Sequence, residues 1–183
     1  MNKIVIDIET TGFDCIKNKI VEITAMEVNS KNKPTGIFFH TYINPKQRII
    51  KDVKRIIELD NKFLKQYPTF NEIKDSFISF IKDNELIYYH TEFNIKFLQQ
   101  ELGFELNNKI TDVLTLAKKI FPNNKHSISS MCLLLNITEG LKFPQNTLNG
   151  TMLILKIYKK LLKQKNSVLI NGVFLFYEFF INF

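Results

Sequence analysis

Apolar and polar positions alternate along the N-terminal part of the chain with a period of two, which is typical of β-strands. The first segment of this kind, residues 3–9, directs its side chains to two opposite faces of a strand: Ile4, Ile6 and Ile8 to one, and Val5, Asp7 and Glu9 to the other. Residues 19–28 and 37–43 alternate in a similar way. Because the connections between the three segments are short, they predict an antiparallel meander.

From about residue 71 the apolar positions recur at helical spacing instead. Residues 71–83 bring Ile73, Phe77 and Ile81 onto one face of a helix. Further helices are expected over residues 92–102, 113–121, 127–135 and 151–163, with short strands between them near 85–89 and 109–112. A meander followed by alternating helices and strands predicts an α/β fold, in which helices flank a mixed five-stranded sheet.

The composition is that of an ordinary globular protein and changes this picture little. The 183 residues suit one domain, and 45% of them are hydrophobic and 23% charged. Asp7 and Glu9 come too early for the apolar region of a signal peptide. Cys15 and Cys132 lack the spacing of metal ligands and suit a reducing compartment, so a cytoplasmic location is expected.

The formal net charge of +7 permits a nucleic-acid partner, because lysine and arginine neutralise phosphates. The chain contains 23 lysines but only 2 arginines, a bias that is typical of an AT-rich genome whatever the function. Arginine is also the better reader of phosphates and bases. The charge is therefore compatible with nucleic-acid binding without establishing it.

The C-terminal residues have a different composition from the rest. From Val168 onward, 12 of 16 residues are apolar, but the longest uninterrupted apolar run is VFLFY, which Glu178 ends. No membrane span is expected from so short a run, and no membrane partner. Three interpretations remain open: the segment docks on a partner protein, packs on its own domain, or has no role.

Asp7 and Glu9 are the first candidates for chemistry, because both lie on the same face of the first predicted strand. Two carboxylates within a few ångströms repel each other unless a cation or a proton lies between them. The pair therefore indicates a metal site. The alternative is a solvated face of an edge strand.

Several segments in a fixed order resemble one family. They are IVIDIETTG, INP, PTF before a helix, ELIYYHTEFNIKFL, ITDVLTLAKKIFP and HSISSMC. Together, over residues 3–163, they resemble the epsilon (proofreading) subunits of bacterial DNA polymerase III, which are DEDD-family 3′–5′ exonucleases. The resemblance implies a ribonuclease H-like fold and an exonuclease-like domain over residues 1–163. It also makes residues 164–183 a possible polymerase-binding segment.

The resemblance also implies a site, cofactors and partners. Asp7 and Glu9 match the first metal-binding motif of the family, while Thr10, Thr11 and Phe93 match positions that contact the terminal nucleotide. The family hydrolyses phosphodiesters at a DNA 3′ end with two divalent cations, Mg²⁺ or Mn²⁺, during proofreading in DNA replication. The expected partners are a DNA 3′ end and the catalytic subunit of DNA polymerase III.

The second and third motifs depart from the family pattern. Asn94 occupies an aspartate position, Gln145 the position of the histidine base, and Gly150 the position of the last aspartate. An Asn carbonyl can ligate Mg²⁺, but it carries no charge; the alternative for Asn94 is a helix N-terminal residue with no metal role. Glu92 is close by in sequence but faces away on the same helix.

The chain has three histidines, and none stands at the position of the base. His40 is interpreted as a strand surface residue, His90 occupies the asparagine position of the second motif, and His126 resembles a loop residue. Glutamine cannot act as a general base, and glycine offers no ligand. Catalysis is therefore expected to be impaired or lost, with one metal ion or none in place of two.

Three functions remain open from the sequence. The first is a working proofreading exonuclease with an altered metal site. The second is a non-catalytic structural subunit associated with the polymerase. The third is a related 3′–5′ exonuclease that acts on RNA ends.

Overall fold

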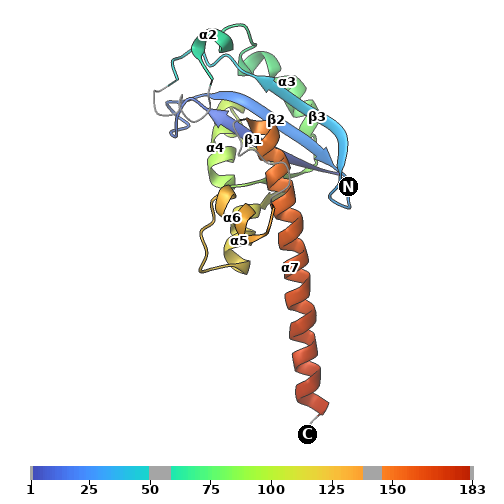
Figure 1. The fold of residues 1–183 in the computed structure, drawn as a ribbon. Coiled ribbons are helices and arrows are strands. Elements are labelled where there is room, and N and C mark those ends of the chain that lie inside the picture. Colours follow the sequence, from blue (N-terminus) through green and yellow to red (C-terminus); the bar gives the residue numbers. More distant parts are fainter. Residues whose placement is uncertain (1, 50–58, 138–145, 182–183) are drawn as a thin grey trace.

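A computed structural model describes residues 2–49, 59–137 and 146–181, with side chains as far as residue 165. In chain order the strands and helices are β1 (Lys3–Thr10), β2 (Ile20–Val28), β3 (Pro34–Tyr42), α2 (Asn61–Leu64), α3 (Phe70–Ile81), β4 (Glu85–Tyr88), α4 (Thr91–Leu102), β5 (Ile110–Asp112), α5 (Val113–Ile120), α6 (Ile128–Leu134) and α7 (Thr147–Ile181). Figure 1 shows how they are arranged.

The strands form one mixed five-stranded sheet in the order β3-β2-β1-β4-β5. The β1–β2 and β2–β3 pairs are antiparallel, whereas β1–β4 and β4–β5 are parallel. This confirms both the predicted meander and the two short strands that join it. β1 lies at the centre of the sheet, between β2 and β4, so both of its edges are paired.

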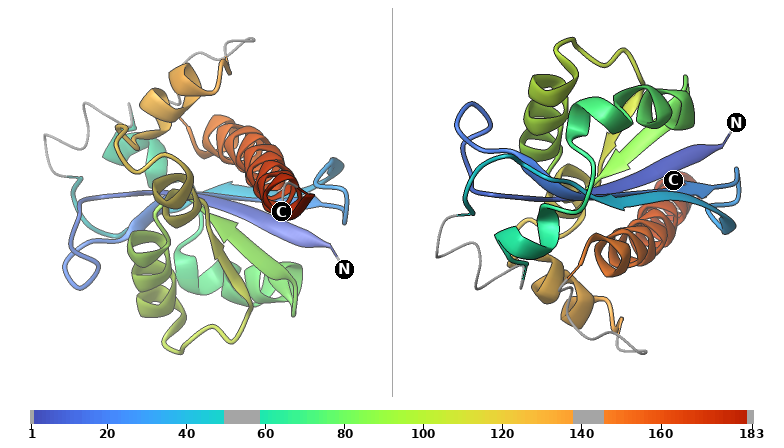
Figure 2. Two further views of the ribbon diagram at one scale, coloured as in Figure 1. Left: turned by 90° about the horizontal axis from the view of Figure 1, so that it is seen from below. Right: turned by 90° about the horizontal axis from the view of Figure 1, so that it is seen from above.

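Helices cover both faces of the sheet, with α3 and α4 on one side and α6 and α7 on the other (Figure 2). The alternation predicted for β1 is confirmed by the two cores. Ile4, Ile6 and Ile8 pack with residues of α3 and α4. Val5, on the opposite face, packs in the core that α5, α6 and α7 complete. Asp7 and Glu9 share the face of Val5 and therefore point toward α7.

The helix α2 was not predicted from the sequence. It has four residues, which is too short to produce a helical period. Its first turn forms because the Asp60 side chain accepts a hydrogen bond of 2.7 Å from the backbone N–H of Phe63.

The helix α7 is longer than predicted at both ends. It begins at Thr147 rather than at residue 151, and it continues without a break to Ile181. The polar residues that follow 163 include lysine and glutamine, which are good helix formers and do not end a helix. The C-terminal part of α7 extends beyond all the other elements (Figure 1). Within the described part of the chain, no helix has the combination of length and apolar character that crossing a membrane requires.

Candidate active site

The site is built on β1 and on its antiparallel neighbour β2. Glu9 lies opposite Glu22, and Asp7 lies opposite Thr24, so these four side chains point to the same face of the sheet. α7 begins above this face and contacts both strands (Figure 1). The two acids of the first motif therefore lie beneath the start of α7, between the sheet and the helix.

Gly150, in the fourth position of α7, lies directly against Asp7. A Cβ atom built on Gly150 would come within 1.8 Å of Asp7 Oδ2. The Asp7 carboxylate therefore fills the space that any side chain at position 150 needs. The structure thus brings Asp7 of the first motif together with position 150, where the family pattern has its last aspartate. Gly150, however, contributes no ligand.

The two acids of β1 lie in an environment that disfavours their charge. Burial, and after it the charge of Glu9, raises the pKa of Asp7 well above its usual value. Burial and the charge of Glu22 raise the pKa of Glu9 to about 7. Among the residues that the structure describes, no cationic side chain forms an ion pair with either acid. A bound cation is the kind of group that offsets such charges.

Glu22 is a third acid at this site, and no motif in the sequence singles it out. It is 1% exposed, and its Oε1 lies 2.9 Å from His40 Nε2 on β3. Its Oε2 accepts a hydrogen bond of 3.4 Å from the backbone N–H of Thr147. The Thr147 hydroxyl also lies 2.6 Å from the hydroxyl of Thr24. Glu22 and Thr24 thus attach the first turn of α7 to β2.

His40 was interpreted from the sequence as a strand surface residue, but the sequence did not reveal its contact with Glu22. Its side chain remains 27% exposed, but the ring reaches inward to the buried Glu22. The alternation of residues 19–28 already placed Glu22 and Thr24 on one face of a strand. The missing information was the register, which sets Glu22 opposite Glu9.

Asn94 lies in the first turn of α4 and is 4% exposed. Its Nδ2 donates to the carbonyl oxygens of Tyr89, at 2.9 Å, and of His90, at 3.1 Å. Its Oδ1 is buried and has no hydrogen-bond partner among the described residues. Because Ile87 of β4 is paired with Val5 of β1, Tyr89 falls at the level of Asp7 on the adjacent strand. Asn94 therefore lies near the same end of the sheet as Asp7.

Glu92 does not replace the missing aspartate. It is exposed, and its carboxylate forms an ion pair of 2.7 Å with Lys96, one turn further along α4. This agrees with the expectation that Glu92 faces away from the site. Gln145, which occupies the position of the histidine base, lies outside the described residues.

The hydroxyl groups of Thr10 and Thr11 are used within the protein. The Thr10 hydroxyl donates to the Gly12 carbonyl at 2.6 Å. The Thr11 hydroxyl accepts from Gln47 Nε2 at 2.6 Å and from the backbone N–H of Lys19 at 3.0 Å. Both threonines are buried and fix the loop that follows β1. Their contact with a nucleotide stays a prediction.

Phe93 and the remaining histidines lie near α4 or beyond it. The Phe93 ring is partly buried, with its centroid 4.8 Å from that of Phe97 in the core, and its contact with a nucleotide also stays a prediction. His90 is exposed at the N-cap of α4. His126 Nε2 lies 2.8 Å from the Phe121 carbonyl oxygen, in the loop expected for it.

The oxygen donors of the site suit a hard divalent cation, although they are few. The carboxylates of Asp7 and Glu9 are of a type that Mg²⁺ and Mn²⁺ accept, and so is the unpaired Oδ1 of Asn94, which lies near the same end of the sheet. Among the described residues, no three His, Cys, Asp or Glu side chains are grouped so as to hold a metal ion. Glu22, the remaining acid, is engaged by His40 and Thr147.

A mixed five-stranded sheet with two acids on its central strand, covered by helices on both faces, defines an α/β protein of the ribonuclease H-like class. The chain belongs to the exonuclease family, whose model matches residues 4–141. This match ends before α7 begins, and therefore before Gly150.

Two relatives in sequence are DNA polymerase III epsilon subunits. The chain is 34% identical over 177 residues to a DNA polymerase III subunit epsilon of Rickettsia felis, in a match that covers 91% of this chain and 76% of that protein. It is 30% identical over 181 residues to a subunit of the same name from Buchnera aphidicola, in a match that covers 92% of this chain and 77% of that protein.

Solved structures of exonucleases share the fold. Exonuclease X in complex with 5′ overhanging duplex DNA superimposes with a TM-score of 0.66 at 16% identity, over 85% of this chain and 90% of that chain. Exonuclease I superimposes with a TM-score of 0.77 at 12% identity, over 94% of this chain and 43% of that chain.

Proposed function

We propose that the chain is an epsilon-type subunit of a bacterial DNA polymerase III, which binds the 3′ end of DNA for proofreading and has weak 3′–5′ exonuclease activity. Support comes from the relatives at 34% and 30% identity, both of which bear the name of that subunit. The first-motif acids Asp7 and Glu9 lie on one face of the central strand, where they can serve as ligands of a metal ion that promotes phosphodiester hydrolysis.

The contact between Gly150 and Asp7 is the observation on which the weak activity rests. The helix α7 is in place above the acids, yet its residue nearest to Asp7 has no side chain. Asn94, at the start of α4, contributes an uncharged oxygen in place of a carboxylate. Gln145 stands at the position of the base, and a glutamine side chain cannot take a proton from water. The loss of a general base alone costs roughly 10²–10⁴-fold in rate.

The residues that remain fit one Mg²⁺ or Mn²⁺ ion. Asp7 and Glu9 would hold it through their carboxylates, and Asn94 through Oδ1. A bound divalent cation supplies charge stabilisation for the phosphate and lowers the pKa of coordinated water. The residues of the chain orient the acids: the backbone at Gly150 confines the Asp7 carboxylate, and the pairing of β1 with β2 directs Glu9 to the same face.

A non-catalytic polymerase-associated subunit is the second candidate, and the attachment of α7 favours it. Glu22 and Thr24 hold the start of α7 on β2 without help from any catalytic residue. The fold can therefore persist for a binding role after catalysis has gone. The C-terminal part of α7 continues beyond the domain as a helix, and we assign to residues 164–183 the contact with the catalytic subunit of the polymerase. A cytoplasmic location accompanies that partnership.

A degradation assay on labelled DNA with a mismatched 3′ end tests the proposal. The wild-type protein is expected to bind this DNA and to shorten it slowly, only with Mg²⁺ or Mn²⁺ present, and Asp7→Ala is expected to remove the residual activity. A matched substrate with an RNA 3′ end is assayed in parallel.

Each outcome separates the candidates. DNA binding with no degradation, together with co-purification of the polymerase catalytic subunit, supports the structural subunit. Faster shortening of the RNA end than of the DNA end supports an RNA exonuclease. A wild-type protein that binds neither substrate contradicts the proposed function.

A further inference from the structure

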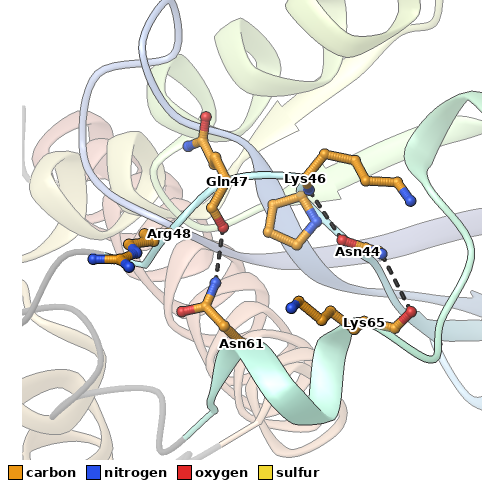
Figure 3. Close-up of a pocket in the computed structure, with 7 residues that line it drawn as sticks. Asn44, Lys46, Gln47, Arg48, Asn61 and Lys65 are labelled. Carbon is orange, nitrogen blue, oxygen red and sulfur yellow. Dashed lines mark hydrogen bonds between the residues drawn. The ribbon is translucent and has the colours of Figure 1, made fainter.

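A pocket of about 680 Å³ lies outside the acid site, between the segment that follows β3 and the helix α2 (Figure 3). Its lining combines cationic and amide side chains with one proline: Asn44, Pro45, Lys46, Gln47, Arg48, Asn61 and Lys65. None of these lining residues is aromatic. The pocket therefore offers charge and hydrogen bonds, and no aromatic ring on which a base can stack.

Two asparagines fix the backbone of this pocket. Asn44 Oδ1 accepts from the backbone N–H of Lys46 at 3.0 Å, and Asn44 Nδ2 donates to the Lys65 carbonyl at 3.3 Å. Asn61 Nδ2 donates to the Gln47 carbonyl at 2.8 Å. Figure 3 shows that the bonds from Asn44 to Lys65 and from Asn61 to Gln47 join the two segments that form the pocket. The amides are thus occupied in holding the walls, and the cationic groups stay available for a ligand.

Three cationic side chains, Lys46, Arg48 and Lys65, are exposed at this pocket. None of them takes part in the ion pairs found between described residues. The pKa of the Glu72 carboxylate is lowered mainly by its hydrogen bonds with Thr69, and only in small part by Lys46. Arg48 is also one of the 2 arginines in a chain with 23 lysines.

Gln47 connects the pocket to the acid site. Its Nε2 donates to the Thr11 hydroxyl at 2.6 Å and to the Lys17 carbonyl at 3.3 Å. Thr11 follows Glu9 by two residues, immediately after β1. The pocket therefore adjoins the end of the strand that carries Asp7 and Glu9, and its cations lie at the same end of β1 as the acids.

We propose that this pocket binds the sugar–phosphate backbone of the substrate strand, on the 5′ side of the nucleotide held at the acids. In Figure 3 the Lys46 and Arg48 side chains extend to opposite sides of the pocket, with Lys65 between them. Cations spread out in this way suit successive phosphates of a strand, whereas a single phosphate group needs cations that converge. Because contacts to phosphates carry no sequence information, binding is independent of base sequence. The inference rests on the proposed function, namely binding of a DNA 3′ end.

Two double variants of equal charge test this proposal. Arg48→Gln with Lys65→Gln removes two cations from the pocket, and Lys31→Gln with Lys33→Gln removes two exposed cations from the β2–β3 connection. Binding of a fluorescent single strand of about ten nucleotides, a length within the usual site size, is measured by anisotropy with EDTA present, so that nothing is degraded. The salt concentration is varied for each protein.

The pocket variant is expected to bind roughly tenfold more weakly than wild type at 0.1 M salt, with a salt dependence that is shallower by about 0.7 for each phosphate that it no longer neutralises. The control variant is expected to stay near wild type in both measurements. Equal behaviour of the two variants overturns the proposal. A different result, that the wild-type protein binds no DNA, would contradict the proposed function itself.

Thymidine monophosphate, as a second probe, separates a strand from a free nucleotide. If the pocket holds the strand, the affinity for the monophosphate is the same in the pocket variant and in wild type, while the affinity for the oligonucleotide falls. An equal loss for both probes shows a site for a single phosphate group and overturns the assignment to the strand.

Discussion

The candidate site has a strand half and a helix half, and they differ in what they retain. In the strand half, Asp7 and Glu9 lie beside Glu22, and all of these side chains are acidic. In the helix half, Asn94 at the start of α4 and Gly150 at the start of α7 occupy the corresponding places without a charge. Both halves belong to one well-packed fold.

The difference teaches that the position of α7 does not depend on its catalytic side chains. Thr147 attaches the helix to Glu22 and Thr24, and Gly150 lets its backbone lie against Asp7. A carboxylate at position 150 would serve a metal ion, whereas the helix itself is held by burial and by these hydrogen bonds. The chemistry of the helix half can therefore be lost while the packing of the helix is kept.

The largest effect is expected from restoring the missing residues together. Asn94→Asp, Gln145→His and Gly150→Asp in one protein should raise the rate of nucleotide release from mismatched DNA by at least about 10²-fold, because ligands and base act as a unit. Each change alone should do little. The Asp7 side chain must turn away from position 150 to admit the new carboxylate, because its Oδ2 now fills that space. Wild-type activity close to that of the triple variant would show that the helix half is not impaired.

The contact between the two halves is tested by Gly150→Ala. The new methyl group collides with Asp7 Oδ2, so we expect the free energy of unfolding to fall by about 1–3 kcal/mol. In an Asp7→Ala background the same substitution should instead stabilise by about 0.5–1 kcal/mol, since alanine is the better helix former. Urea denaturation of the four proteins measures both values. If the sign does not reverse, Asp7 does not fill the space beside Gly150.

The cost of charge in the strand half is tested by Glu9→Gln. The pKa of Glu9 rises from 4.5 to about 7 in the fold, so the folded state holds the proton more tightly than the unfolded chain. The contribution of Glu9 to stability is present below about pH 4.5 and is lost as the pH rises through about 7. Glu9→Gln should therefore stabilise the protein by about 2 kcal/mol near pH 8, and much less near pH 4.

Glu92→Gln is the matched control for that experiment. Glu92 is exposed, and its hydrogen bond and ion pair with Lys96 lower its pKa, so its removal should bring no gain in stability near pH 8. Thermal unfolding across the pH range gives the comparison. An equal gain from both variants would mean that burial does not raise the pKa of Glu9.

The smallest effect concerns the cation itself. Mn²⁺ at about ten times its dissociation constant should stabilise the wild-type protein by about 1.4 kcal/mol, and chelation with EDTA should reverse this. Asp7→Asn with Glu9→Gln should abolish the response, because both carboxylates are gone. Calorimetry should give at most one cation per chain. Two tightly bound cations in the unmodified protein would show that the helix half supplies ligands after all.

Much of the fold and part of the site could be predicted from the sequence. The three strands of the meander and most helices appear within a few residues of their predicted bounds, because strand alternation and helical spacing are local properties. α2 was missed because four residues carry no period. The predicted end of α7 was wrong because the polar stretch after residue 163 contains no proline or glycine that would end a helix. The site residues of the helix half were found only through the family resemblance.

The sequence by itself determined that Asp7 and Glu9 share one face of a strand, since that follows from the period of two. It also determined that Asn94 and Gly150 bring no charge. Only the tertiary structure decided that Glu22 joins these acids, that Asp7 fills the space beside Gly150, and that Lys46, Arg48 and Lys65 meet in one pocket. These contacts depend on strand register and on the docking of distant segments, which burial and long-range hydrogen bonds fix and which no local pattern encodes.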